Sequence, residues 1–212
     1  MNSSKVDNSE IRVIKGQECR RHISLNHTYG VGRLGGWVAL TATVAPTAYV
    51  GPGALVLDHA QVLDNAQILH EVVVSGHARV QDSASLAGVA RVRDNAIIEG
   101  SSKVHGRSIV SDCAKISGRS DIDGYSRIGG NAVVQDSSIY ENAQVYGESL
   151  VRNSSIGGNA VIRLHASIFN ETGINGDTIL EFSREQIEED RHSKLMDPLR
   201  WAHLHPGDNC LP

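Results

Sequence analysis

The sequence predicts an all-β solenoid, a chain wound into stacked coils, and two repeated features carry this prediction. From Val38 to Val134, every sixth residue is Val, Ile or Leu without exception. The residue four places after each of these is Ala or Ser throughout the same stretch, except at Val72. A double repeat of this length and regularity is the sequence signature of a solenoid.

The six-residue period indicates extended structure that turns at regular intervals. Six is a multiple of the strand period of two, so the recurring aliphatic side chains point to the same side. Turn-forming pairs follow the aliphatic residues, as in Asp64-Asn65 and Gly118-Arg119, because Gly, Asn and Asp favour tight turns. Three steps make one three-sided coil, and stacked coils pair their backbones as parallel strands.

Two shortened steps interrupt the register without ending the repeat. Ile139 follows Val134 after five residues instead of six, and Ile156 follows Val151 in the same way. The shortened segments are predicted to occupy the same corner of consecutive coils, where the corner narrows. Counted to Leu180, the chain makes about eight coils, a rod of roughly 38 Å at ~4.8 Å per coil.

This register of inward aliphatic and small corner residues resembles the hexapeptide repeat of left-handed β-helix proteins, over roughly two thirds of the chain. The resemblance implies a left-handed parallel β-helix of about eight triangular coils. Handedness comes from the resemblance alone, because general sterics favour right-handed crossovers.

Further motifs resemble the YdcK-type β-helix proteins of bacteria and phages, which usually carry the label of transferases. The matching motifs are Gly35-Gly36-Trp37-Val38 and the triplets Asp64-Asn65-Ala66, Asp94-Asn95-Ala96, Gly130-Asn131-Ala132 and Gly158-Asn159-Ala160. The transferase label rests on analogy of fold, which does not establish chemistry.

We expect three parts: a tail and cap at 1–37, the β-helix at 38–181, and a helical extension at 182–212. The open end of a β-helix exposes unpaired strand edges. The glycine-rich N-terminal part is therefore predicted to cap that end, with Trp37 sealing it; a ligand-binding loop is the alternative.

The last part of the chain carries helix signals. Residues 183–186 fit a capping box, which predicts a helix over about residues 184–196, and Asp197-Pro198 reads as a second helix start. Trp201 and Leu204 supply apolar anchors. We expect this segment to cap the C-terminal end of the rod or to bind a partner.

Composition excludes several classes of function. The net charge of −4 gives no electrostatic footprint for nucleic acid. The first ten residues are polar, and no apolar run approaches the ~20 residues that span a bilayer, so we expect no membrane insertion and a cytoplasmic location. No phosphate-binding loop or nucleophile elbow is present. No cofactor and no metal is expected.

Hexapeptide acyltransferases are the best-known enzymes with this repeat, and resembling them would imply a histidine base, an acyl-CoA donor and a trimer with sites between subunits. His105, which is expected to project from a flat face at mid-rod, is the candidate base under that hypothesis. His59 and His77 stand eighteen residues apart at one corner of adjacent coils and could bind a metal or share a proton. Ordinary surface histidines are the alternative for all three. The repeats contain no inserted loop, which weakens the enzyme hypothesis because a smooth prism has no pocket of its own.

One side of the coil, carrying Val50 and Ile68, is predicted to present an apolar contact surface. Its expected outward residues are Leu55, Leu69, Val73, Ala87 and Ile109. A homotrimer or dimer through this side is the natural outcome; scattered surface aliphatic residues are the alternative.

Three functions remain open from the sequence. The first is a rigid interaction or structural protein that presents flat faces to itself or to a protein partner. The second is an acyltransferase with an acyl-CoA site between subunits. The third is a phage- or plasmid-borne inhibitor that binds a host or defence complex.

Overall fold

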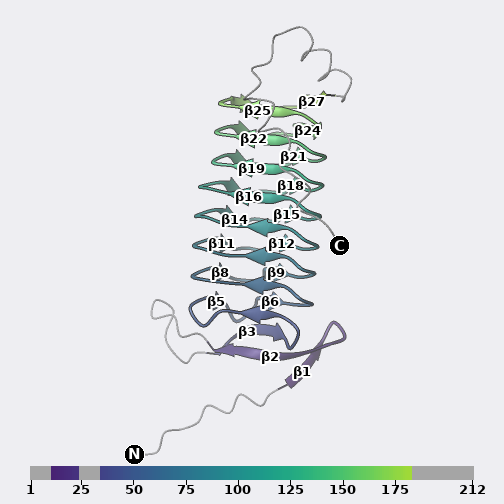
Figure 1. The fold of residues 1–212 in the computed structure, drawn as a ribbon. Coiled ribbons are helices and arrows are strands. Elements are labelled where there is room, and N and C mark those ends of the chain that lie inside the picture. The colour runs from purple at the N-terminus through teal and green to yellow at the C-terminus, as the bar shows by residue number, and fades with distance from the viewer. Residues whose placement is uncertain (1–10, 24–33, 183–212) are drawn as a thin grey trace, which may run out of the picture.

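The computed structural model describes residues 11–23 and 34–182 of the 212-residue chain. All regular structure in these residues is β-strand, arranged in three sheets. From β3 onward consecutive strands go to successive sheets, so the chain climbs as a stack of coils (Figure 1). Two sheets have eight strands each, in agreement with the predicted number of coils.

Sheet A has eleven strands. In spatial order they are β1 (Ile11–Ile14), β2 (Gln17–Ile23), β3 (Leu34–Ala39), β6 (Leu55–Val56), β9 (Val73–Val74), β12 (Arg91–Val92), β15 (Ile109–Val110), β18 (Arg127–Ile128), β21 (Gln144–Val145), β24 (Val161–Leu164) and β27 (Ile179–Phe182).

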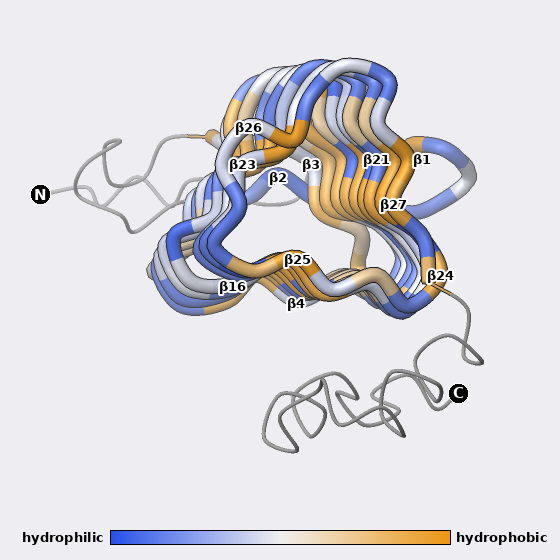
Figure 2. The backbone as a smooth tube through the Cα atoms, turned by 90° about the horizontal axis from the view of Figure 1, so that it is seen from above, coloured by the Kyte–Doolittle hydropathy of each residue, from blue (hydrophilic) through white to orange (hydrophobic). Residues whose placement is uncertain are grey.

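Sheets B and C make the other two sides. Sheet B contains β4 (Thr43–Val44), β7 (Gln61–Val62), β10 (Arg79–Val80), β13 (Ile97–Ile98), β16 (Lys115–Ser117), β19 (Val133–Gln135), β22 (Leu150–Arg152) and β25 (Ser167–Phe169). Sheet C contains β5 (Tyr49–Val50), β8 (Gln67–Ile68), β11 (Ser85–Leu86), β14 (Lys103–Val104), β17 (Asp121–Ile122), β20 (Ser138–Ile139), β23 (Ser155–Ile156) and β26 (Thr172–Ile174). Seen along the stack, the sheets enclose one interior (Figure 2).

The predicted hydrophobic spine lines this interior. Val62, Val80 and Ile98 pair as neighbours in sheet B, and each is fully buried. The preceding residue of each strand points outward, and Gln61 and Arg79 are exposed. The predicted solenoid is therefore confirmed, and every short strand contributes one inward and one outward side chain.

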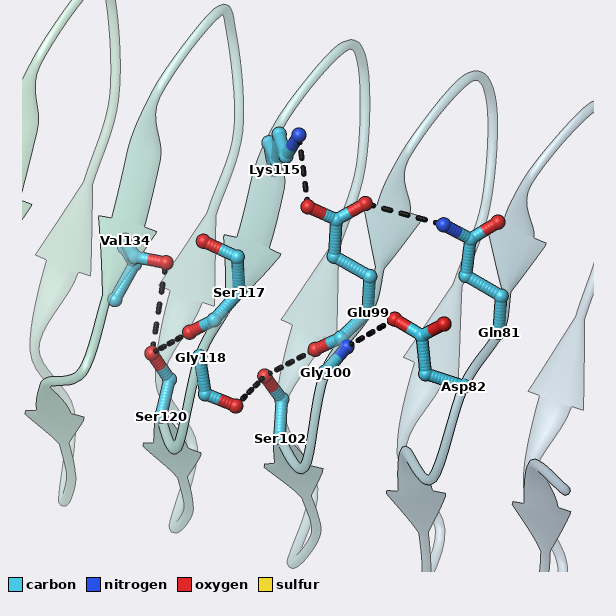
Figure 3. A network of polar contacts seen from close by, with 10 residues as sticks. All are labelled: Gln81, Asp82, Glu99, Gly100, Ser102, Lys115, Ser117, Gly118, Ser120 and Val134. Atoms are coloured by element: carbon cyan, nitrogen blue, oxygen red, sulfur yellow. Dashed lines mark hydrogen bonds and ion pairs between the residues drawn. The ribbon is translucent and has the colours of Figure 1, made fainter.

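The corners depend on left-handed backbone conformation, as the Gly, Asn and Asp pairs predict. Asp112 has a φ of 58°, and its Oδ2 accepts the backbone N–H of Gly130, one coil further on, at 2.8 Å. Asp82 caps Gly100 in the same way at 2.8 Å (Figure 3). An aspartate at these positions therefore satisfies a backbone donor that the parallel ladder leaves free.

The small residue of each repeat lies buried inside the corner. The N–H of Ala96 donates to the carbonyl of Arg93, three residues earlier, at 3.3 Å. Where serine replaces alanine, the hydroxyl can use the same acceptor: Ser102 Oγ donates to the carbonyl of Glu99 at 2.7 Å (Figure 3). Alanine and serine both fit this position, although the buried hydroxyl of Ser126 has no hydrogen-bond partner among the described residues.

The shortened steps narrow one corner, between sheets B and C, and a ladder of serine hydroxyls fills it. The backbone N–H of Ser137 donates to Ser120 Oγ at 3.3 Å, and that of Ser154 to Ser137 Oγ at 3.1 Å. Glu171 continues the ladder to Ser154 Oγ at 3.1 Å. The structure thus has a third narrowed corner, near Glu171. It cannot be seen in the sequence, because the strand that follows has a register shift near Gly173 that adds one residue and keeps the inward residues six apart.

At the N-terminal end, β1 and β2 form an antiparallel hairpin that pairs with β3 and extends sheet A alone. Val38 pairs with the inward Val56, so its neighbour Trp37 faces outward. The Trp37 ring lies beneath the guanidinium groups of Arg12 and Arg21, at 5.2 and 4.3 Å from its centroid. Trp37 is nevertheless only 8% exposed and counts among the buried apolar residues of the core. That it seals the end of the rod stays a prediction.

Glycine is needed at positions 35 and 36 for a steric reason. A Cβ atom at either position would overlap backbone oxygens of the first coil, those of Val50 and Gly51 among them. Glycine is required where β3 crosses this close to the coil. The predicted C-terminal helix, with Trp201 and Leu204, lies outside the described residues.

Candidate functional site

His105 is held between two carboxylates on the outer face of sheet C. It directly follows β14, and Asp121 and Asp123 occupy the next coil, on and just after β17. Its Nε2 lies 2.6 Å from Asp121 Oδ1, and its Nδ1 lies 3.1 Å from Asp123 Oδ1. The imidazole side chain is 36% exposed, so the cluster lies at the surface.

This geometry limits what His105 can do chemically. A general base must direct a nitrogen lone pair at the proton that it removes. Both ring nitrogens of His105 already face a carboxylate oxygen, and a ring protonated on both would donate to both. The arrangement therefore suits a contact that ties two coils together better than a catalytic base.

Sequence reasoning selected His105 but missed its two partners. Asp123 stands eighteen residues later, which is the spacing of one coil, and Asp121 precedes it by two residues on the same outward side. That spacing was the signal that could have found them.

His59 and His77 stack at the corner between sheets A and B, as their spacing predicts. Their ring centroids are 5.2 Å apart with an interplanar angle of 20°, and both residues are exposed. Within the described ranges, no group of three or more His, Cys, Asp or Glu side chains is placed to hold a metal ion. The stack is a surface contact between coils.

The five apolar contact candidates do not share one side of the rod. Leu55, Val73 and Ile109 lie on sheet A. Leu69 and Ala87 follow β8 and β11, and their backbone N–H groups remain in the ladder of sheet C. The prediction of a single apolar side is therefore wrong.

The reason for this error is a turn that lies between the candidates. His70, with a φ of 53°, bends the chain between Leu69 and Val73 and sends them to different sheets. Leu55 and Val73 are also only partly exposed, because they pack against the core. Trp201 and Leu204, the other two candidates, are outside the described part of the chain.

Hollows occur at both ends of the stack. One of about 330 Å³ is lined by His22, Val38 and Val44 at the N-terminal end. His22 is 9% exposed there; burial lowers the pKa of its imidazole, the hydrogen bond to the Ala48 carbonyl at 3.2 Å opposes this shift, and Arg20 adds to it. One of about 440 Å³, lined by residues that include Ile174 and Leu180, lies at the last described coil.

Three sheets built from successive short strands define this chain as a parallel β-solenoid protein. No known protein family has a model that matches the sequence, and no curated protein matches it significantly. The described residues include no helix that is long and apolar enough to cross a membrane.

Proposed function

We propose that the protein is a rigid β-helix scaffold that presents flat sheet faces to other protein surfaces, either in self-association or to a different partner. The observation that carries this proposal is the unbroken coil. Between β3 and β27, no connection between consecutive strands is longer than four residues. Between β3 and β27 the chain therefore forms flat, hydrogen-bonded faces, and no long loop protrudes from them.

Such faces suit contact with another protein. Eight stacked strands make a sheet roughly 34 Å tall at ~4.8 Å per strand. A specific interface needs about 800 Å² from each partner, which a face of this height can supply. The proposal includes a dimeric or trimeric assembly, the left-handed sense of winding and the likeness to YdcK-type proteins, which rest on the resemblance to known β-helix proteins.

The acyltransferase hypothesis makes a different demand, namely an acyl-CoA molecule bound between copies with a free histidine base beside it. The carboxylates on both nitrogens of His105 favour the scaffold over this alternative. An inhibitor of a host or defence complex would be one particular use of the same scaffold.

Two measurements on the purified protein test the proposal. Light scattering after size exclusion should give the mass of a dimer or trimer, or of a complex with a co-purifying protein. Titration calorimetry with acetyl-CoA should give no binding heat. Acetyl-CoA binding that His105→Ala abolishes and His77→Ala leaves intact would replace the scaffold with the acyltransferase. A monomer that binds neither a protein nor acetyl-CoA would contradict both hypotheses.

A further inference from the structure

The middle of sheet A carries three arginines on its outer side, and a fourth stands at the adjoining corner. Arg91 lies on β12 with Arg93 just after it, Arg127 lies on β18, and Arg107 is at the corner that precedes β15. Strands β12, β15 and β18 are hydrogen-bonded neighbours, stacked one above another (Figure 1). All four arginines are exposed. We call this surface the arginine face.

The charge of this face is partly compensated, because the Asp112 carboxylate lies beside Gly129, next to the Tyr146 ring. Among the described residues, no carboxylate lies within ion-pair distance of Arg91, Arg107 or Arg127. Arg93 has one partner, Asp94, at 3.5 Å, and both side chains are about half exposed. A surface pair of that kind contributes little. Several positive charges therefore stand close together on a chain whose net charge is −4.

Aromatic and aliphatic side chains lie between the arginines. Ile109 stands between Arg91 and Arg127 in the same outward column of the sheet. Tyr125 is 60% exposed, and the centroid of its ring lies 5.9 Å from Cζ of the Arg107 guanidinium. The face is therefore mixed in chemistry and not a uniform basic stripe.

Tyr146 borders the face on the next coil. Burial raises the pKa of its hydroxyl; Arg127 and Arg93 oppose this shift, and Asp112 adds to it. The ring itself leans over Gly129, where a Cβ atom would meet it at 2.9 Å.

The choice of side chains indicates the chemistry of the ligand. Arginine presents a planar fork that binds carboxylates with two parallel hydrogen bonds. Arginine and tyrosine are also the residues enriched at the energetic centres of protein interfaces. A long nucleic acid would have to overcome the negative net charge of the chain, and its affinity would rest mainly on phosphate contacts.

We propose that the arginine face binds an acidic segment on the surface of a protein partner. This inference rests on the proposed scaffold function and names the chemistry of its partner. Arg91 and Arg127 are two strand spacings apart, about 10 Å. The partner must therefore present several carboxylates within that distance, with an apolar group to cover Ile109.

The test uses the full chain and a fluorescent peptide of twenty glutamates as the probe. Fluorescence anisotropy measures the dissociation constant for the wild type and for Arg91→Gln/Arg127→Gln. The charge-matched control is Arg79→Gln/Arg119→Gln, which removes two exposed arginines outside sheet A. We expect at least a tenfold loss of affinity for the first variant and less than a twofold loss for the control.

Three outcomes would overturn the inference: no peptide binding by the wild type, equal losses in the two variants, or tighter binding of a twenty-nucleotide single-stranded DNA than of the peptide. Melting temperatures should agree among all three proteins, because these side chains are exposed. If the scaffold proposal itself is wrong, the protein will instead bind acetyl-CoA or be a monomer that binds no protein partner. If the scaffold proposal is right and only the role of the arginine face is wrong, both arginine variants will keep the oligomeric state or the protein partner of the wild type.

Discussion

The ring of Tyr140 lies directly against Gly157, which stands one coil further along sheet C. A Cβ atom at Gly157 would overlap three atoms of that ring. Gly157 has no left-handed φ, so the glycine is needed for space and not for backbone conformation. The aromatic ring thereby covers backbone that a glycine would otherwise leave open on the outer face.

This contact predicts the effect of a small substitution. Gly157→Ala should lower the free energy of unfolding by about 1 kcal/mol, because overpacking forces the ring away. In a Tyr140→Ala background the same change should cost much less. Urea denaturation of the four proteins in this cycle measures the difference. Equal costs in both backgrounds would show that the ring is not the obstacle.

Leu164, the last residue of β24, has a strained backbone. Its φ of 61° is left-handed, at a position where the coils below have glycine or aspartate, and its side chain is 45% exposed. A left-handed residue with a Cβ costs about 1–2 kcal/mol. Leu164→Gly should therefore raise the free energy of unfolding by about 0.5–1 kcal/mol after the greater chain entropy of glycine is deducted. Leu164→Ala keeps the strain, so a gain of the same size in that variant would contradict the explanation.

The hairpin at the N-terminal end should weaken in acid. Burial holds the pKa of His22 below its ordinary value near 6.5, so below that pH the unfolded chain takes up a proton that the folded chain resists. The free energy of unfolding should therefore decrease as the pH falls through 6.5. Unfolding measured at pH 7.5 and pH 5.5 should show this loss in the wild type and a smaller one in His22→Gln, which keeps a donor for the Ala48 carbonyl. Identical pH dependence in the two proteins would exclude His22 as the source.

Much of this fold can be predicted from one physical fact, namely that a buried side chain must recur at every bend. The spine through Val62, Val80 and Ile98 follows from it, and so does the narrowing near Asp136, because both are visible as residue counts. The third narrowing is not visible, since the shift near Gly173 cancels the missing residue. Counting alone detects only net changes in length.

The surface was harder to predict, because it depends on which residue of a corner belongs to which sheet. Leu69 and Val73 are four residues apart, and only the turn at His70 separates their faces. The sequence also does not reveal that the guanidinium groups of Arg12 and Arg21 cover the Trp37 ring. To predict the contacts of His105, one must know which residues of the next coil lie beside it.

The most direct test of the solenoid compares two adjacent isoleucines on β13. Ile98 is fully buried in the interior, whereas Ile97 points outward on the same strand and is partly exposed. Ile98→Ala should lower the free energy of unfolding by about 2–5 kcal/mol, and Ile97→Ala by less than about 1 kcal/mol. Equal losses, or a larger loss for Ile97→Ala, would contradict the inward spine on which the whole account depends.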